Sequence, residues 1–365
     1  MKIFCTKDDL ADGVSKVQKA VSARNTLPVL QGIKMSTEGD ALIFEATDLE
    51  MGIRCRVPVN VLEEGVMVLP ASLLADLTRR LPEGAVSLES ADNILNIIYG
   101  ESNFQINGFD PEEFPELGRT DMEENFALDG ARLKKMIKQT IFARALLDEA
   151  KPVFSGVLLE KNSENVRLVC TDTHRLAFIS LPLAGEGSDF SGVIPGKTMA
   201  EILRLLEDET VSVSFDRSKM IFKFQNVEIM TRLIAGQYPN YVNVIPKSCG
   251  TKVRFHAKQM EDVVERASLI SRDNPRKIAV VRLRIADNQI SIAQNNESGR
   301  IFEIIEVEQE GDDVQISFNA RYMLDMLRVM ETEYLIMEAS GPFGAAIFRP
   351  DNEEEYISMI LPMRQ

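Results

Sequence analysis

A helical spacing of apolar residues recurs six times along this chain of 365 residues. One copy consists of Met199, Ile202, Leu203 and Leu206, at positions i, i+3, i+4 and i+7. A second copy consists of Leu73, Leu74, Leu77 and Leu81, and the others begin at Leu10, Leu133, Met260 and Met323. Such a stripe predicts an amphipathic helix that lies with one face on a sheet. Because the pattern spans most of the chain, it indicates an array of similar units.

The six stripes come in three pairs, and each follows a strand-like run. Corresponding helices begin roughly 125 residues apart, a size typical of single domains. Alternating apolar and polar runs follow the helices, as in 41–46 and 211–215, and predict half-buried strands. We therefore expect an α+β fold of three repeated domains, each with two helices packed on antiparallel sheets. The expected domains are 1–120, 121–247 and 248–365.

Charge is distributed unevenly between the predicted helices and the rest of the chain. The net charge is −15, which alone argues against binding to nucleic acid. The helical spans nevertheless contain 18 basic and 10 acidic residues; these spans are 7–24, 71–80, 129–146, 196–206, 257–272 and 320–330. Binding to phosphate follows the local field, so helices that share one face would form a basic surface on an acidic protein.

The sequence contains little that indicates catalysis. Only His174 and His256 are present, without HExxH, GxSxG or a cluster of Cys and His that could bind a metal. The segment Gly192–Thr198 is one residue short of a phosphate-binding loop, although it lies between a predicted strand and a predicted helix. We expect neither an enzyme nor a cofactor. A nucleotide-binding enzyme that uses this segment is the alternative, and a structural repeat protein without a DNA role is another.

Cysteine usage and hydropathy suggest where the protein resides. Cys5, Cys55, Cys170 and Cys249 are scattered without CxxC spacing, which favours single buried thiols in a reducing compartment. No apolar run approaches the length needed to cross a bilayer. We expect a cytoplasmic protein without membrane partners.

Two segments depart from the regular pattern. Thr171–Leu176 is a polar turn directly after the predicted strand 166–170. The chain then ends in an apolar strand, 356–365, although chain ends are normally polar and frayed. Met363 and its neighbours are suited to form a pocket for a partner peptide, since flexible Met side chains adapt to varied ligands.

These segments carry a resemblance to a known family. Asp48-Leu49-Glu50-Met51, Thr171–Leu176, Leu361–Arg364 and the segment from Arg24 to Leu30 resemble the bacterial DNA polymerase sliding clamp, the beta subunit of DNA polymerase III. The resemblance implies a DNA clamp fold, in which two subunits join head to tail as a homodimer ring around duplex DNA. The ring would act as a processivity factor in DNA replication, binding DNA independently of sequence. Its other partners would be the polymerase catalytic subunit, the clamp loader and further proteins with clamp-binding motifs.

The resemblance also implies three sets of site residues. The candidates for contact with DNA phosphates are Arg24, Arg79, Arg80, Lys138, Lys197 and Arg204. The partner-peptide pocket would contain Phe154, Thr171, Thr173, His174, Arg175, Leu176, Pro239, Val244, Met359, Ile360, Pro362, Met363 and Arg364. The dimer interface would contain Phe104, Leu269 and Ile270. This chain has Thr173 where the family usually has glycine and Asn243 where an arginine is frequent, which bears on the choice of peptide.

Overall fold

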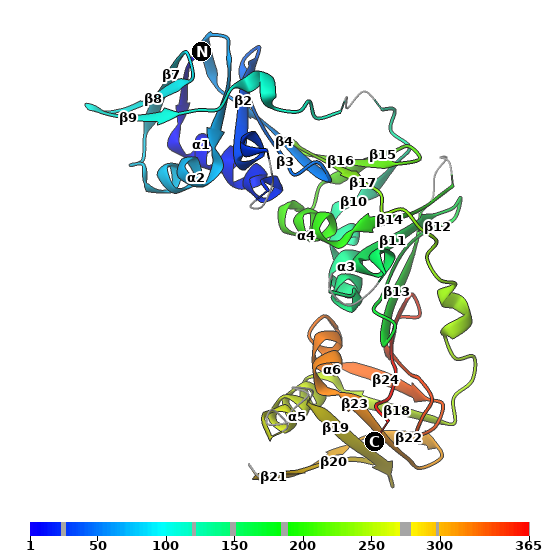
Figure 1. Cartoon of the computed structure of the whole chain (residues 1–365). Helices are drawn as coiled ribbons and strands as arrows, with labels where there is room; N and C mark the ends of the chain where they lie inside the picture. The colour runs from blue at the N-terminus through cyan, green and yellow to red at the C-terminus, as the bar shows by residue number, and fades with distance from the viewer. Residues whose placement is uncertain are drawn as a thin grey trace. The chain divides into compact units, whose positions relative to one another are not determined.

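The computed structural model describes residues 1–22, 27–118, 122–146, 151–183, 189–270, 279–296 and 299–364 (Figure 1). The chain divides into two compact units. The first unit comprises Met1–Leu133 and Glu201–Leu233, and the second comprises Lys134–Ala200 and Ile234–Gln365.

All six predicted helices are present. They are α1 (Lys7–Val17), α2 (Ala71–Arg80), α3 (Gly130–Thr140), α4 (Gly196–Leu205), α5 (Ala257–Ile270) and α6 (Ala320–Leu327). Thr6 fixes the start of α1 through a capping box, because its hydroxyl accepts from the Asp9 N–H while the Asp9 carboxylate accepts from the Thr6 N–H.

Several helices are shorter than the spans expected from the sequence. Short 3-10 helices follow α1 and α3, and the set comprises η1 (Gln18–Ala20), η2 (Pro28–Gln31), η3 (Pro111–Glu113), η4 (Ile141–Ala143), η5 (Pro152–Ser155) and η6 (Tyr241–Val244). Within the observed α-helical bounds there are 13 basic and 9 acidic residues. The basic excess of the helices is therefore smaller than expected, and α3 is the helix with four basic and no acidic residues.

The stripe predicted for α2 is partly wrong. Leu73 is 42% exposed, and the residues that α2 buries are Ala71, Leu74, Ala75 and Thr78. These four residues also follow the i, i+3, i+4, i+7 spacing, so two stripes overlap on this helix. The buried face of α2 consists mainly of small side chains. The stripe of leucines predicted a different, adjacent face of the helix.

The first unit contains two antiparallel sheets. One has the strand order β5-β1-β7-β8-β9 and the other β10-β15-β16-β17-β4-β3-β2-β6. The strands are β1 (Lys2–Thr6), β2 (Gly32–Glu38), β3 (Ala41–Thr47), β4 (Met51–Pro58), β5 (Asn60–Glu63), β6 (Val66–Pro70), β7 (Ala85–Ala91), β8 (Ile94–Tyr99), β9 (Ser102–Asn107), β10 (Phe126–Asp129), β15 (Thr210–Phe215), β16 (Lys219–Phe224) and β17 (Val227–Arg232). Helices α1 and α2 lie side by side, and α1 packs on β3 and β4 (Figure 1).

The second unit repeats this plan. Its sheets have the orders β14-β11-β12-β13-β26-β25-β24-β18-β22 and β21-β20-β19-β23. The strands are β11 (Gly156–Lys161), β12 (Asn165–Thr171), β13 (Arg175–Pro182), β14 (Phe190–Pro195), β18 (Thr251–His256), β19 (Val280–Ala286), β20 (Gln289–Asn296), β21 (Gly299–Glu306), β22 (Glu308–Gly311), β23 (Val314–Asn319), β24 (Tyr334–Ala339), β25 (Ala346–Pro350) and β26 (Tyr356–Ile360). Helix α5 lies beside α6 and packs on β19, β20 and β21 (Figure 1).

One kind of strand pairing occurs twice. In the first unit β4 pairs with β17, and Cys55 lies opposite Val227. In the second unit β13 pairs with β26, and Ile179 lies opposite Tyr356. We call these pairings the β4–β17 joint and the β13–β26 joint. Strand β9 ends one sheet of the first unit, and β21 ends one sheet of the second.

None of the helices in the described ranges has the length and apolar character that crossing a membrane requires.

Candidate functional site

A tight turn leads into β13 and presents its side chains beside the β13–β26 joint. The Thr171 hydroxyl donates to the carbonyl of Arg175 at 2.7 Å. The Asp172 carboxylate accepts from the N–H groups of His174 and Arg175, both at 2.9 Å. Thr173, which lies between Asp172 and His174, has φ of 77°, a left-handed conformation that favours glycine. The turn thus holds Thr173 and His174 outward from the sheet.

Arg175 is buried under this turn. Its side chain is 7% exposed, and its guanidinium pairs with Asp172 at 3.0 Å and with Asp325 at 2.7 Å. It also lies over the ring of Tyr322, with 4.4 Å between the guanidinium carbon and the ring centroid. Arg175 was expected in the partner-peptide pocket, and these contacts inside the protein favour a role in positioning the turn.

A cavity of about 270 Å³ opens beside the turn. Its walls are formed by Ala145, Lys151, Phe154, Asp172, Thr173, His174 and Tyr322. Phe154, Thr173 and His174 were expected at a peptide pocket. Lys151 and Tyr322 were not, and Tyr322 comes from α6, far from the turn in sequence, so no local pattern could have indicated it.

An apolar cluster lies at the same joint. It contains Leu158, Val169, Leu176, Val193, Tyr241 and Met359, with Tyr238 packed against it. The Tyr241 hydroxyl donates to Glu160 at 2.7 Å, and burial raises the pKa of Tyr241 so that the phenol stays neutral. Leu176 and Met359 were expected in the pocket and are 1% and 4% exposed, so they form its support rather than an open wall.

The remaining expected pocket residues differ widely in exposure. Val244 is 54% exposed and Ile360 is fully buried. Pro239 and Arg364 are exposed, Pro362 and Met363 are half-buried, and Thr171 is buried. The end of the chain is anchored by two backbone hydrogen bonds, from the Leu361 N–H to His174 at 2.9 Å and from the Met363 N–H to Ser317 at 2.8 Å. This anchoring explains how an apolar segment so close to the end of the sequence is held in place.

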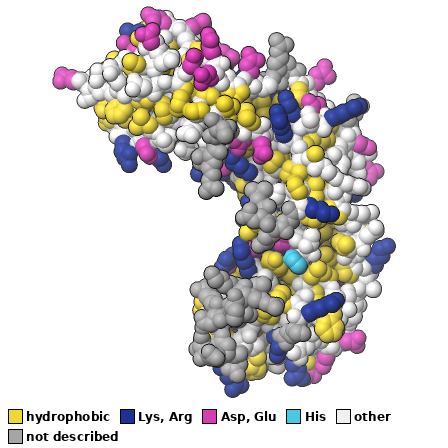
Figure 2. All heavy atoms as spheres, in the orientation of Figure 1, with side chains coloured by type: hydrophobic (Ala, Val, Ile, Leu, Met, Phe, Trp, Pro, Cys, Tyr) yellow, Lys and Arg dark blue, Asp and Glu magenta, His cyan; other side chains and the backbone are white. Residues whose placement is uncertain are grey.

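The expected DNA-contacting residues that the structure describes are exposed, and several are paired with acids. Arg79 binds Asp76 at 2.7 Å, and Arg204 binds Glu201 at 2.6 Å. Lys138 pairs with Glu331. Arg80 and Lys197 are exposed on α2 and α4, and Arg24 lies outside the described residues. On the face shown in Figure 2, basic side chains stand in several separate groups.

Strands β9 and β21, each at one edge of a sheet, carry exposed apolar side chains, and so does the end of α5. Phe104 on β9 is 36% exposed, and Leu269 near the end of α5 is 55% exposed. Ile270 is half-buried. Strand β21 adds Phe302, 59% exposed, and Ile304, 47% exposed, which sequence reasoning missed because an edge strand alternates in the same way as a central one. Arg266 on α5 pairs with Glu303 of β21 and lowers the pKa of that carboxyl group.

Comparison with known proteins decides the family. Three family models match in series: the N-terminal domain of the DNA polymerase III beta subunit over residues 1–118, the central domain over 127–240 and the C-terminal domain over 242–364. This chain belongs to the DNA polymerase III beta subunit family. The beta sliding clamp of Bacillus subtilis is 32% identical, with both chains covered in full. The beta sliding clamp of Halalkalibacterium halodurans is 30% identical with the same coverage.

Solved structures of beta subunits have the same fold. The crystal structure of the sliding clamp from Bacillus subtilis matches with a TM-score of 0.95 and 31% identity, covering 100% of this chain and 99% of that one. A Pseudomonas aeruginosa sliding clamp bound to griselimycin matches with a TM-score of 0.94 and 27% identity, covering both chains in full. The three-domain clamp fold expected from the sequence is confirmed. As a beta subunit, the chain is a non-catalytic processivity factor.

The nucleotide-binding alternative also fails on local structure. In this beta subunit Gly192 to Pro195 belong to β14 and pair with β11, so they form no loop around a phosphate. Thr198, which would have to reach a bound cation, is fully buried. The segment is a strand that runs directly into α4.

Proposed function

We propose that this beta subunit joins a second copy head to tail, closes into a ring around duplex DNA, and tethers the replicative polymerase in the cytoplasm. The clamp loader and other partners would use the same peptide pocket in turn. The observation that carries the proposal is the repeated joint: β4 pairs with β17 and β13 pairs with β26, while β9 and β21 lie at sheet edges. We divide the chain into domains 1–120, 121–247 and 248–365, so each joint links one domain to the next.

The repeat specifies which strands would close the ring. Three hairpins have the same register at intervals of 124 residues: Ala41 lies opposite Pro58, Asn165 opposite Pro182 and Gln289 opposite Glu306. Strands β4, β13 and β21 therefore occupy equivalent places in the repeat. Strands β17 and β9 are likewise equivalent, because each is the second strand of a hairpin with the same turn. The turns are closed by the opposite residues Phe224 and Val227 in one hairpin and Tyr99 and Ser102 in the other. The third joint would therefore pair β9 with β21 of the partner subunit.

The same equivalence predicts the register of that third joint. Glu303 is the counterpart of Cys55, and Ser102 is the counterpart of Val227. Ser102 would then lie opposite Glu303 of the partner subunit, and Phe104 opposite Ile301 of the partner subunit. In the β4–β17 joint the corresponding pair, Ile53 and Ile229, is fully buried.

Apolar burial would hold the third joint together. Phe104 and Leu269 are large and exposed in the single chain, and pairing of β9 with β21 would cover Phe104 on the sheet face that α5 packs against. Side chains of this type at the centre of an interface contribute most of its stability. A paired edge also removes the unsatisfied backbone groups that make free edge strands prone to aggregation.

Contact with DNA would be weak and independent of sequence. Arg24, Arg79, Arg80, Lys138, Lys197 and Arg204 are the proposed phosphate contacts. Basic side chains on helix surfaces bind phosphates without reading bases. Ion pairs such as Arg204–Glu201 would moderate each contact, which suits a ring that must slide rather than stay at one site. The acidic remainder of the protein repels other DNA segments.

Tethering would use the cavity beside the β13–β26 joint. Phe154, Thr173 and His174 line it, and the cluster around Leu176 and Met359 supports it. The set proposed for the peptide pocket from the sequence is kept, with Arg175 in a positioning role. A bound peptide would keep the polymerase at high effective concentration near the primer end.

Retention on circular DNA tests this proposal. After loading, the protein should stay on nicked circular DNA during gel filtration and be lost once the DNA is linearised. The variant Phe104→Asp should be monomeric and should not be retained, because a charge would occupy the centre of the interface. Equal retention on linear and circular DNA would contradict the ring.

A further inference from the structure

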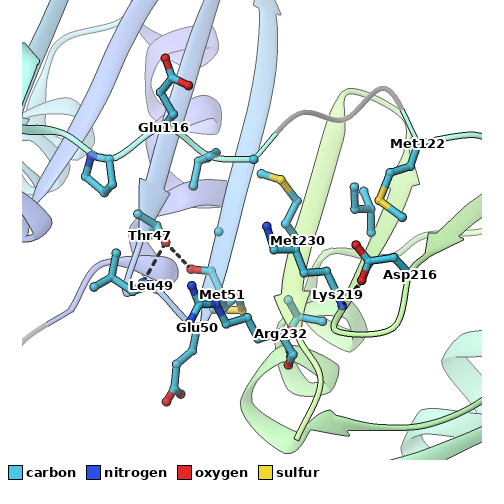
Figure 3. Close-up of a pocket in the computed structure, with 16 residues that line it drawn as sticks. Thr47, Leu49, Glu50, Met51, Glu116, Met122, Asp216, Lys219, Met230 and Arg232 are labelled. Carbon is cyan, nitrogen blue, oxygen red and sulfur yellow. Dashed lines mark hydrogen bonds between the residues drawn. The ribbon is translucent and has the colours of Figure 1, made fainter.

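The first unit contains a cavity of about 400 Å³ at the β4–β17 joint. Figure 3 shows its walls, formed by β4 and the turn before it on one side and by β16 and β17 on the other. The lining residues are Thr47, Leu49, Glu50, Met51, Gly52, Pro115, Glu116, Leu117, Gly118, Met122, Asp216, Lys219, Ile221, Met230, Thr231 and Arg232. We call it the β4–β17 cavity.

This cavity is the counterpart of the proposed peptide pocket. The turn before β4 repeats the turn before β13: the Thr47 hydroxyl donates to the Met51 carbonyl at 2.8 Å, and the Asp48 carboxylate accepts from the N–H groups of Glu50 and Met51. Leu49 has φ of 75°. By the repeat spacing, Leu49 and Glu50 stand where Thr173 and His174 stand in the other turn.

A methionine and a proline that line the β4–β17 cavity also have counterparts in the proposed peptide pocket. Met230 lies opposite Gly52 as Met359 lies opposite Leu176, so the two methionines are equivalent. Pro115 lies 124 residues before Pro239, in the echoing segments Phe114-Pro115 and Tyr238-Pro239.

The β4–β17 cavity differs from its counterpart in being more apolar at its floor. Met51 replaces Arg175, and Gly52 replaces Leu176. An added Cβ on Gly52 would come within 2.6 Å of Leu117, so Leu117 covers the space that a leucine fills in the other copy. Met51 and Ile221 are buried, and Met230 is half-buried. An aliphatic side chain of leucine size would therefore find apolar contacts here.

Charge distinguishes the two mouths. Glu50 stands where the other copy has His174, and Glu116 also lines the cavity here. Asp216 and Lys219 line the cavity from the opposite side, whereas Arg232 lies beside Glu50, because its N–H donates to the Glu50 carbonyl at 2.9 Å. Backbone hydrogen bonding from Ser218 lowers the pKa of Asp216, which keeps that carboxylate charged. The lining thus carries three acids and two bases, and this excess of negative charge complements a basic ligand group.

We propose that the β4–β17 cavity is a second peptide-binding site, which takes an extended segment of a partner protein with an aliphatic side chain on the floor and a basic residue beside Glu50. A peptide is the ligand because the residues equivalent to Leu49, Glu50, Pro115 and Met230, namely Thr173, His174, Pro239 and Met359, all belong to the set proposed for the partner-peptide pocket. In this respect the inference rests on the proposed function. Because Glu50 stands in place of His174, the two sites select different partners.

Methyl NMR of the full-length protein labelled at its methionines tests this directly. Met51, Met122 and Met230 line the β4–β17 cavity, whereas Met359 and Met363 report on the other site. The probes are the acetylated and amidated peptides Lys-Leu-Leu-Lys and Glu-Leu-Leu-Glu. We expect the basic peptide to shift the Met51 and Met230 signals saturably and the acidic peptide to bind there more weakly.

The variant Glu50→Lys provides the decisive comparison. Glu50 is exposed, and reversing its charge should lower the affinity of the basic peptide for this cavity about fivefold. Glu64→Lys is the matched control, since Glu64 is exposed and outside the lining, and it should leave the affinity unchanged.

Three results would overturn the second site. Shifts confined to Met359 and Met363 would refute it and leave the proposed function standing. Equal binding of both peptides, insensitive to Glu50→Lys, would refute the peptide specificity and indicate a general apolar cavity. An absence of shifts at Met51, Met122 and Met230 with either peptide would also refute it, while retention on circular DNA reports on the clamp function separately.

Discussion

Leu49 and Thr173 occupy the same position in two copies of one turn, and both hold a left-handed backbone, with φ of 75° and 77°. Neither residue is glycine, although only glycine adopts this conformation without steric cost. The strain is repeated because Thr47 and Thr171 close both turns with the same hydrogen bond to the residue four positions on.

Replacing Thr173 by glycine should therefore stabilise the second unit. We expect Thr173→Gly to increase the free energy of unfolding by about 1 kcal/mol, because relief of backbone strain exceeds the added entropy of the unfolded chain. Urea denaturation measures the change. Thr173→Ala is the control and should give no gain, since alanine keeps the strained Cβ. A lower stability of the glycine variant would show that φ at this position is not a source of strain.

Arg175 should be essential for the stability of the turn. Arg175→Ala removes the partner of Asp172 and leaves Asp325 without its closest cation, so we expect a loss of about 3–5 kcal/mol. Arg175→Lys should recover part of the loss, because an ammonium replaces the charge but cannot bind both carboxylates and the Tyr322 ring in the same way. Arg217→Ala, at an exposed turn, should change stability by less than about 0.5 kcal/mol. A similarly small effect of Arg175→Ala would contradict the positioning role.

Thiol reactivity should be confined to one cysteine. Cys249 is exposed, which corrects the expectation of four buried thiols, while Cys5, Cys55 and Cys170 are buried. Burial raises the pKa of Cys5 and of Cys55 to about 12. Because the thiolate is the reacting species, iodoacetamide at neutral pH should modify Cys249 in the native protein and all four cysteines in denaturant. Mass spectrometry of the native sample would refute this if Cys5 or Cys55 were modified as fast as Cys249.

Reversal of helix charges should weaken DNA binding in a salt-dependent way. The double variant Arg80→Glu with Lys197→Glu removes two proposed phosphate contacts. The slope of log K against log salt should fall by about 0.9 per contact for duplex DNA, measured by fluorescence anisotropy. The double variant Arg217→Glu with Lys247→Glu is the charge-matched control, since both residues are exposed and lie outside the helices, and it should leave the slope unchanged. An equal fall in the control would show that net charge, rather than the helix surface, sets binding.

The sequence predicted the repeating parts of the fold better than the parts that depend on distant pairing. Six helices followed from periodicity, since a stripe is a local property. The buried face of α2 did not, because Leu73 and Ala75 belong to two overlapping stripes that only packing distinguishes. The burial of Arg175 depends on Asp325, 150 residues away, which no local pattern indicates.

The candidate sites show the same limit. Thr173 and His174 were identified from the turn and line the cavity, but Tyr322 reaches it from α6. Phe302 and Ile304 were missed because alternation along a strand does not reveal whether the strand has a neighbour on both sides. The β4–β17 cavity requires the pairing of β4 with β17, in which Cys55 and Val227 lie opposite each other although they are far apart in the sequence.

Disulfide closure of the proposed third joint tests the central claim most directly. Met230 lies opposite Gly52 in the β4–β17 joint, as Met359 lies opposite Leu176 in the β13–β26 joint. Gln105 is the counterpart of Met230 and Arg300 is the counterpart of Gly52, so Gln105 would lie opposite Arg300 of the partner subunit. Directly opposite residues in an antiparallel pair lie within disulfide reach. A variant with Gln105→Cys, Arg300→Cys and Cys249→Ser should therefore oxidise to a covalent dimer. The control combines Gln105→Cys with Ile304→Cys, about 13 Å further along β21 and beyond reach.

The reduced protein would be loaded on nicked circular DNA, oxidised there and then treated with detergent. We predict that the in-register variant stays linked to the circle under these denaturing conditions and is released when the DNA is cut. Release from the intact circle, or oxidation of the off-register control with equal efficiency, would contradict a ring closed by β9 and β21.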